Sequence, residues 1–465
     1  MLILNSALFV ENVMSSIKGE KGGIFCLDAP GGTGKTFVLN ALLSAVRSDG
    51  HIALGTAISA VASKLLNNGG TVHSTFKVPI KIDETSLCRF KRNNAVGKLL
   101  FRTKLILIDE VTMGHRYVYE AIDRSLRDLL EAEKHFGNIV VVFSGDWRQC
   151  LPIVPKGSHA QILDACLKSS HLWKMVMVYK LKENMRVKMS GSADSKAFSD
   201  FLLSVGDGLT TIDGSNEMEI PEDMLIPAKE GIDNLIDFVF PDIKIHWDNS
   251  TWLSERAILC PTNEQAAELN GRVSDKFPGK YKIYKSCDST DDNSHEYPME
   301  LLNLMNLPGV APHKLALKNG MIVMLLRNID PKNGHCNGVK YIINNMLDHV
   351  IEVTVISGSF AGNRLFVPRI FMEPSVSHLP FNMRRKQFPL KPAFAMTSNK
   401  AQGQTLSRVG IYLGQDFFSH GQVYVAISRC GNREQIKIFT RSEKKSGSGL
   451  HTMQNVVFKT VLTPD

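Results

Sequence analysis

The sequence lacks the patterns that mark membrane proteins, disulfide-rich secreted proteins and structural zinc domains. No uninterrupted apolar run approaches the roughly 18 residues that a membrane span needs, and residues 1–12 lack the basic region that opens a signal peptide. The eight cysteines include no pair separated by two residues. That spacing argues against structural zinc and favours a reducing compartment. We therefore expect an intracellular protein with no membrane segment and no structural zinc.

The length, composition and net charge exclude few other classes of protein. A length of 465 residues allows roughly two to four domains with ample cores. The apolar content of 43% and the charged content of 22% are ordinary for a soluble globular protein. The formal net charge of +8 is a mild excess. It permits a polyanionic partner but does not require one.

A glycine-rich stretch near the start, LDAPGGTGKT at residues 27–36, carries the first strong pattern. It matches the phosphate-loop motif except that Ala29 replaces the first glycine. Lys35 is placed to reach the outer phosphates of a nucleotide and Thr36 to bind Mg²⁺. A turn without a ligand is the alternative, but an apolar strand before the loop and a helical pattern after it favour the nucleotide site. The predicted phosphate-binding residues are Pro30, Gly31, Gly32, Thr33, Gly34, Lys35 and Thr36.

Two further strand ends carry polar residues that suit nucleotide hydrolysis. The apolar run LILI is followed by Asp109, a candidate Mg²⁺ ligand, and Glu110, a candidate base for the attacking water. Gln149 follows a third apolar strand and is placed to contact both the γ-phosphate and that water. Each pattern is common by itself, since exposed loops often carry acidic or amide groups. Their order after a phosphate loop makes them a candidate active site.

The strand and helix patterns predict one architecture twice. Strands that end in polar clusters occur in the first 180 residues, and the pattern restarts near residue 256 with further strands up to about residue 440. Between them, residues 316–390 read as short strands separated by Gly, Asn and Pro turns, which predicts a small all-β barrel. The fold class is therefore α/β, with two nucleotide-binding lobes and a barrel inserted in the second.

Two arginines are candidates for stabilising the charge of a leaving phosphate. Arg186 lies in LKENMR and Arg429 in VYVAISR. A planar guanidinium suits the charge that develops during phosphoryl transfer. For any single arginine a role at the protein surface is the alternative.

Nine motifs occur in an order that resembles the petite-integration-frequency family of superfamily 1B DNA helicases. They include APGGTGKT, LILIDE, SGDWRQCLPIV, LKENMR, TSNKAQGQTL and VYVAISR, and they extend from Leu4 to about Phe439. The match is closest to the branch carried by helitron-type transposons. No two histidines are two residues apart, so we expect no nuclease of the His-x-His type that full transposon proteins carry.

This resemblance implies an ATP- and Mg²⁺-dependent motor that moves 5′ to 3′ on single-stranded DNA and unwinds tailed duplexes. It implies two RecA-like lobes that act as a monomer in the nucleus, with mitochondria as the alternative, in replication, repair, recombination or telomere maintenance. The expected domains are a first lobe at 1–180 with a small wedge at about 77–98, a second lobe at 181–315 and 391–465, and the barrel at 316–390.

The resemblance also assigns roles residue by residue. The catalytic set is Lys35, Glu110, Gln149, Arg186 and Arg429, both arginines being expected to act across the cleft between the lobes, and Asp109 and Thr36 hold the metal. Gly403 joins the nucleotide-binding residues. The DNA-binding residues are Thr71, His73, Ser74, Phe76, Lys400, Gln404 and Thr405. Physically, His73 and Phe76 fit either a stacking platform for bases or core packing, and both alternatives stay open.

Several departures from the family pattern bear on activity. Ala29 replaces a glycine of the phosphate loop, Ala60 replaces a glycine near the expected DNA track, and Leu8 stands where the family has a glutamine that reads adenine. We therefore keep a second hypothesis, a transposon-derived fragment that binds ATP or DNA with weak turnover. A P-loop kinase or GTPase is a third hypothesis, which the second lobe and the paired arginines disfavour.

Overall fold

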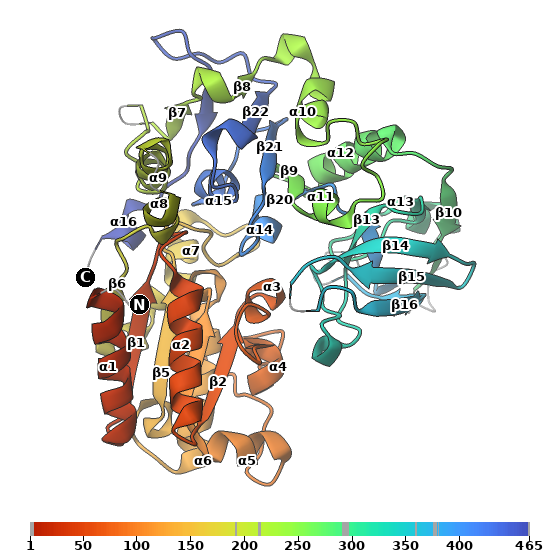
Figure 1. Ribbon diagram of the computed structural model, residues 1–465. Helices are drawn as coiled ribbons and strands as arrows, with labels where there is room; N and C mark the ends of the chain where they lie inside the picture. Colours follow the sequence, from red (N-terminus) through yellow and green to blue (C-terminus); the bar gives the residue numbers. More distant parts are fainter. Residues whose placement is uncertain are drawn as a thin grey trace. The chain divides into compact units, whose positions relative to one another are not determined.

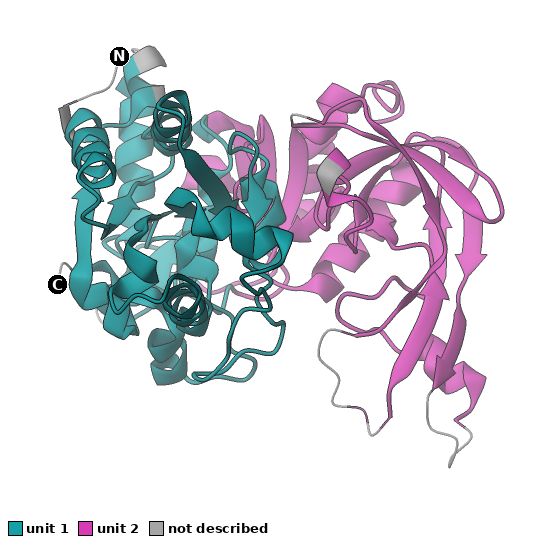
Figure 2. Cartoon of the chain, turned by 90° about the horizontal axis from the view of Figure 1, so that it is seen from below, with its two compact units in different colours: residues 1–219, 417–433, 445–465 teal, residues 220–416, 434–444 magenta. Residues whose placement is uncertain are grey.

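The structure is a computed structural model that describes residues 4–190, 193–212, 215–290, 297–358, 360–374, 379 and 381–463. The chain forms two compact units, coloured separately in Figure 2. Unit 1 comprises residues 1–219, 417–433 and 445–465, and unit 2 comprises residues 220–416 and 434–444. These limits differ from the predicted domains, because residues 181–219, 417–433 and 445–465, which were expected in the second lobe, fall in unit 1.

Unit 1 is built on a six-stranded parallel sheet in the order β3-β2-β4-β5-β1-β6 (Figure 1). Its strands are β1 Gly23–Asp28, β2 Ile52–Ala57, β3 Gly70–Thr71, β4 Thr103–Asp109, β5 Val140–Gly145 and β6 Val176–Lys180. Successive side chains of β1 belong to two separate cores, Ile24 and Cys26 to one and Phe25 and Leu27 to the other. Both faces of the sheet are therefore buried, which explains why its central strands read as continuous apolar runs.

Helices from distant parts of the chain belong to the same unit. Those of the N-terminal part are α1 Leu4–Lys18, α2 Lys35–Ser48, α3 Ala60–Ser63, α4 Val72–Phe76, α5 Ala95–Phe101 and α6 Arg116–Leu130. They are followed by α7 His159–Ala165, α8 Met185–Ser190, α9 Ala193–Gly206, α15 Gln422–Ser428 and α16 Lys459–Leu462. Short 3₁₀ turns are η1 Val111–Met113, η2 His135–Asn138, η3 Leu167–Ser169 and η4 His171–Met175. A two-stranded ribbon of β7 Glu217–Glu219 and β23 Thr452–Gln454 completes the unit.

Unit 2 contains a second parallel sheet in the order β20-β9-β21-β22-β8. Its strands are β8 Leu225–Ile226, β9 Arg256–Cys260, β20 Ala395–Thr397, β21 Arg408–Leu413 and β22 Ile436–Thr440. Its helices and turns are η5 Glu222–Met224, η6 Ala228–Glu230, α10 Ile232–Val239, α11 Ser250–Ser254, α12 Asn263–Lys276, α14 Ser398–Ala401 and η8 Arg433–Gln435. The two parallel sheets give the α/β architecture that the sequence predicted.

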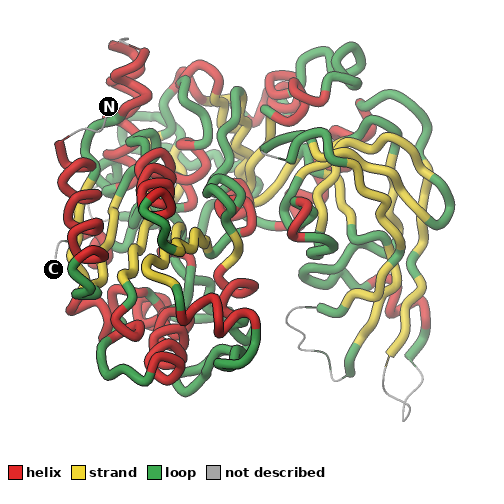
Figure 3. The backbone as a smooth tube through the Cα atoms, turned by 60° about the horizontal axis from the view of Figure 1, so that its bottom comes forward, coloured by secondary structure: helices red, strands yellow, loops and turns green. Residues whose placement is uncertain are grey.

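The remaining strands of unit 2 pair antiparallel, and Figure 3 shows them as long yellow segments. They are β10 Lys282–Lys285, β11 Cys287–Thr290, β12 Lys314–Leu317, β13 Ile322–Leu325, β14 Lys340–Met346, β15 Val350–Val355, β16 Arg364–Pro368, β17 Ile370–Met372, β18 Met383–Gln387 and β19 Leu390–Pro392, with α13 Met299–Leu304 and η7 Pro331–Asn333. The sheets are β10-β12, β11-β18-β17 and β16-β15-β14-β13-β19. Antiparallel pairing thus begins at β10, before the predicted start at residue 316.

One buried ion pair fixes the edge of this antiparallel region. Arg385 on β18 is 1% exposed and forms a bidentate pair with Asp288 on β11, with nitrogen–oxygen distances of 2.8 and 2.9 Å. The same guanidinium donates to the carbonyls of Leu302, Met305 and Ala311. Because the charges are paired and the donors satisfied, their burial is tolerated. Among the described residues no helix has the length and apolarity needed to cross a bilayer.

Candidate nucleotide site

The loop between β1 and α2 has the backbone shape of a phosphate cradle. Gly32 and Gly34 have φ of 87° and 82°, in the left-handed region that glycine adopts without strain. A Cβ on Gly32 would come within 2.8 Å of the Asn184 side chain. Gly34 caps α2, so the free N–H groups of the first helical turn open toward the loop. The sequence therefore places glycine where the loop requires it.

Lys35 joins the phosphate loop to the end of β4. Its Nζ lies 2.8 Å from Asp109 Oδ1 and 3.0 Å from Glu110 Oε1. Burial by itself disfavours the ammonium, but the two carboxylates outweigh burial and raise the pKa of Lys35 above its usual range. Burial also raises the pKa of Asp109, against the opposing effect of Lys35. The structure thus brings together three of the residues that the sequence singled out.

Glu110 has a strained backbone. Its φ of 55° and ψ of 40° are left-handed, which is uncommon for a residue with a side chain, and it is 5% exposed. Its N–H donates to Asp109 Oδ1 at 2.8 Å. Strain of this kind costs about 1–3 kcal/mol and concentrates at functional sites. Thr36, the other predicted metal ligand, is half-buried in the first turn of α2.

A buried hydrogen-bond network surrounds Asp146, which follows β5. Its Oδ2 accepts from the Tyr424 hydroxyl at 2.8 Å and from Gln149 Nε2 at 3.2 Å. The Tyr424 oxygen in turn accepts from the Gly31 N–H at 3.4 Å. Burial raises the pKa of Asp146, with Arg148 acting in the opposite direction. Gln149 Oε1 is buried without a hydrogen-bond partner among the described atoms, so the network retains an acceptor for a further donor.

Sequence reasoning missed Tyr424, although it lies in the motif that contains Arg429. Tyr424 and Asp146 are 278 positions apart in the chain, and no short-range pattern links a phenol to a carboxylate over that distance. The sequence offered no more than proximity as a signal, since Tyr424 lies in the same apolar segment as Arg429. The structure places this phenol between the phosphate loop and the loop that carries Gln149.

Arg429 lies in unit 1, directly after α15. It is 7% exposed, and its Nε donates to the Val425 carbonyl at 2.9 Å while Nη2 donates to Ser428 Oγ at 2.8 Å. Burial lowers its pKa, and the negative charge of Glu110 is the first of several groups that oppose this effect. We expected this arginine to come from the second lobe. The compact-unit division instead assigns residues 417–433 to the unit that holds Lys35.

The start of α15 docks closely on the Gln149 loop. A Cβ on Gly421 would lie 2.4 Å from the Arg148 carbonyl oxygen, and Gly421 has φ of 73°. His420 contacts the Trp147 carbonyl through Nε2 at 2.9 Å and accepts from the Phe458 N–H through Nδ1 at 2.9 Å. Both contacts fix where α15 begins. Glycine is required at 421 for space as well as for backbone conformation.

The other predicted arginine, Arg186, lies on α8, and its side chain falls outside the described residues. The backbone places the helix next to the phosphate loop, because Met185 N–H donates to the Gly32 carbonyl at 3.0 Å. Asn184 Nδ2 donates to Ser199 Oγ at 2.8 Å and ties the helix start to α9. The role of Arg186 stays a prediction.

The predicted DNA-binding residues of unit 1 divide into two groups. Thr71 caps α4 and bonds with Ser74, and His73 and Ser74 are exposed on that short helix. Phe76 is fully buried in the core under the sheet. The prediction that the Phe76 ring contacts DNA is therefore wrong, since a ring without exposed surface cannot stack on a base. Core packing, the alternative reading of Phe76, is what the structure shows.

The predicted residues of unit 2 gather around α14. Lys400 and Gln404 are half-buried, Thr405 is exposed, and Gly403 has φ of 79°. Gln404 Nε2 donates to the Lys400 carbonyl at 3.0 Å. A second lysine, which the sequence did not suggest, lies beside Lys400. Burial, reinforced by the Lys400 ammonium, lowers the pKa of Lys391 to about 7.

The departures from the family pattern have specific structural contexts. Ala29 is buried in the core, its N–H donates to the Gly145 carbonyl at 2.9 Å, and it is absent from the residues with positive φ. The loop therefore needs no glycine at position 29. Ala60 begins α3, whose cap is the Ser59 hydroxyl. Leu8 is 51% exposed on α1.

Comparisons with known proteins show which proteins the chain is similar to. Residues 2–216 match the family model of PIF1-like helicases, and residues 300–346 match the model of the 2B domain of the DNA helicase Pif1. The human ATP-dependent DNA helicase PIF1 is 25% identical over 422 residues, which cover 90% of this chain and 58% of the relative. The Pif1 helicase of Campylobacter jejuni is 24% identical over 91% of this chain and 90% of its own length. The chain spans about 60% of the length of the vertebrate relatives it matches.

Solved structures show the same fold. The Bacteroides Pif1 structure bound to single-stranded DNA matches with a TM-score of 0.66 and 22% identity over all of this chain and 95% of that one. The Pif1 helicase of Candida albicans matches with the same score and 21% identity, over 99% of this chain and 97% of that one. At these identities the similarity establishes the arrangement of strands and helices.

Proposed function

We propose that the chain is a PIF1-like helicase that uses ATP to unwind DNA, a proposal supported by the match of residues 2–216 to the model of PIF1-like helicases and of residues 300–346 to the model of the Pif1 2B domain. The observation that carries this proposal is the cluster of Lys35, Asp109 and Glu110 at the end of two parallel strands. An ammonium beside a metal-binding carboxylate and a second carboxylate is what phosphoryl transfer to water requires. The curated relatives carry the same activity in their names.

The residues present fit ATP with Mg²⁺. Left-handed Gly32 and Gly34 shape the loop for close approach of phosphate oxygens, and Thr36 and Asp109 offer the hydroxyl and carboxylate oxygens that Mg²⁺ prefers. When bound, the ion would neutralise charge on the outer phosphates. Lys35 would hold the same phosphates, and Glu110 would accept a proton from the attacking water. The unpartnered Gln149 Oε1 would orient that water.

Arg429 would supply the positive charge that the transition state needs. Its guanidinium is buried and within electrostatic reach of Glu110. In such a low-dielectric environment, electrostatic interactions are stronger than in water. Arg186 would provide a second guanidinium from α8. Leu8 replaces the adenine-reading glutamine of the family, so we propose that discrimination among nucleoside triphosphates is weak.

Single-stranded DNA is the proposed track. Exposed His73 and Ser74 in unit 1 and the Lys391–Lys400 pair in unit 2 offer hydrogen-bond donors and charge for phosphates. We propose that the protein moves 5′ to 3′ along single-stranded DNA as a monomer and unwinds tailed duplexes. We also propose a nuclear or mitochondrial location. The antiparallel region would form the inserted barrel, and residues 77–98 would form the wedge. The proposed lineage is the helitron-type branch of the family.

The decisive experiment measures ATP hydrolysis with and without single-stranded DNA, followed by strand separation on 5′-tailed and 3′-tailed duplexes. We expect low basal hydrolysis, strong stimulation by DNA and unwinding of the 5′-tailed substrate. Binding should weaken with salt because phosphate contacts release counterions. Hydrolysis that DNA leaves unchanged would favour the fragment hypothesis, and unwinding of only the 3′-tailed duplex would overturn the polarity.

A further inference from the structure

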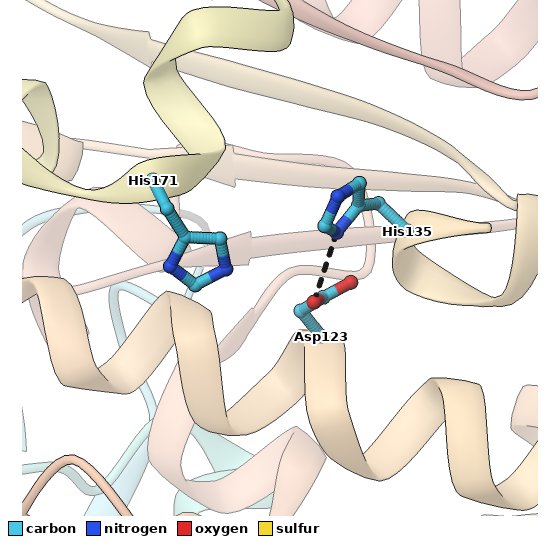
Figure 4. Close-up of side chains that lie close together, drawn as sticks. All are labelled: Asp123, His135 and His171. Carbon is cyan, nitrogen blue, oxygen red and sulfur yellow. Dashed lines mark hydrogen bonds and ion pairs between the residues drawn. The ribbon is translucent and has the colours of Figure 1, made fainter. Parts of the chain in front are cut away.

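Three metal-binding side chains converge on unit 1 outside the nucleotide site. They are Asp123 on α6, His135 at the start of η2 and His171 at the start of η4, and one donor atom of each lies within 4.8 Å of the others. Figure 4 shows the two rings and the carboxylate gathered on one side of α6. The Asp123 Oδ2 to His135 Nδ1 distance is 3.1 Å, and the two ring centroids are 6.0 Å apart.

The ligand atoms of these three side chains are of the kind that bind transition-metal ions. Two imidazole nitrogens and one carboxylate oxygen suit Zn²⁺ and its neighbours, which bind such atoms at about 2.0–2.2 Å. Ligand atoms on one tetrahedral ion are then about 3.4 Å apart. The Asp123–His135 separation of 3.1 Å is already within that value, and the upper limit for the whole cluster, 4.8 Å, exceeds it by about an ångström. Side chains of His135 and His171 are 31% and 57% exposed, so rotation of the rings can close the difference.

Contacts around the cluster resemble the outer shell of a metal site. Asp123 is 1% exposed, and its Oδ1 accepts from the Phe136 N–H at 2.5 Å, which fixes the carboxylate and leaves Oδ2 facing His135. Glu120 lies three residues before Asp123 on α6, and its Oε1 is 3.7 Å from His171 Nδ1. A carboxylate beside one ring nitrogen orients the other nitrogen toward an ion. The Ser170 hydroxyl donates to the same Glu120 oxygen at 2.7 Å and holds it in place.

We propose that Asp123, His135 and His171 bind a divalent transition-metal ion of the Zn²⁺ class, with water as the fourth ligand. The ion would add a link among α6, the turn before β5 and the turn before β6, which hydrogen bonds already connect. Its role is therefore stabilisation of unit 1. The sequence argument against structural zinc considered paired cysteines alone, and it has no bearing on ligands that come from three separate segments.

The test uses the full chain, stripped of metal with a chelator and exchanged into buffer with excess MgCl₂ to occupy sites that prefer oxygen ligands. ZnCl₂ is titrated by calorimetry, and CoCl₂ is followed by its visible spectrum, which reports the ligand geometry. We expect one Zn²⁺ site and a four- or five-coordinate cobalt spectrum. At a concentration 100 times Kd, Zn²⁺ should raise the Tm of unit 1 by about 5–10 °C.

His171→Ala is the informative variant, because the ring is mostly exposed and its removal leaves the Asp123 contact with Phe136 intact. It should lose the site, with at least a tenfold weaker Zn²⁺ affinity and no cobalt spectrum. His51→Ala removes an exposed imidazole elsewhere on unit 1 and should behave as the wild type. Equal stoichiometry and affinity in wild type and His171→Ala, or no Zn²⁺ binding by the wild type, would overturn the proposal.

Discussion

His420 should make the stability of unit 1 depend on pH in a predictable window. The ring is fully buried, its Nδ1 accepts from the Phe458 N–H, and Nε2 then carries the proton that it donates to the Trp147 carbonyl. This pattern fixes the neutral tautomer. A second proton would have to sit on Nδ1, against an N–H group. Burial is the main reason that the pKa of His420 falls from 6.5 to about 4.

The sign follows from proton counting. Between pH 4 and 6.5 the unfolded chain binds a proton at His420 and the folded chain does not, so the free energy of unfolding rises with pH across that window. The stability is fully present above pH 6.5 and is lost as the pH falls toward 4. The shift of about 2.5 units corresponds to about 3 kcal/mol, since each unit is worth about 1.4 kcal/mol.

The control variant is His420→Gln. Glutamine can donate to the Trp147 carbonyl and accept from the Phe458 N–H, but it does not titrate. Urea midpoints should be measured from pH 4.5 to 7.5 by tryptophan fluorescence, because Trp147 and Trp173 both lie in the core of unit 1. We expect the wild type to lose stability faster than the variant below pH 6.5. Parallel pH profiles would show that His420 does not titrate differently in the two states, and the argument would fail.

Four further substitutions test the nucleotide site. Glu110→Gln should bind ATP but stop turnover, and normal hydrolysis by this variant would refute its role as base. Lys35→Ala should abolish hydrolysis and lower stability by about 3–5 kcal/mol in urea melts, because it leaves two buried carboxylates without their cation. Arg429→Lys should lower kcat by about 10³-fold with little change in ATP affinity, whereas an unchanged kcat would assign it a structural role. Tyr424→Phe should cost about 1–3 kcal/mol, because it removes a hydrogen bond to the fully buried Asp146 carboxyl group; Tyr179→Phe, whose partner Asn12 is only half-buried, is the matched control and should cost less.

The nucleotide site was largely predictable because it depends on short motifs at strand ends. In a parallel sheet the carboxyl ends of neighbouring strands meet at one edge. Lys35, Asp109 and Gln149 follow β1, β4 and β5, and β5 lies between the other two in the sheet. The order of apolar runs and polar termini therefore contained enough information to predict that these residues lie together.

Contacts between distant segments were not predictable in this way. The Tyr424 hydroxyl reaches Asp146 only because residues 417–433 pack with unit 1, and no local period signals that return of the chain. Phe76 could not be assigned from its spacing, since a buried ring and a stacking ring look alike in sequence. The same holds for the cluster of Asp123, His135 and His171, which three separate segments contribute.

The return of residues 417–433 to unit 1 changes how substitutions in this motif should be interpreted. Arg429 shares a compact unit with Lys35, so the position of its guanidinium depends on the docking of α15 as well as on any closure between lobes. Two contacts set that docking, Tyr424 to Asp146 and His420 to Trp147, and Gly421 allows the close approach that both need. A substitution at Arg429 changes the guanidinium itself, whereas one at Tyr424 or His420 displaces the helix that carries it. The first should lower kcat at constant stability, and the second should lower both together.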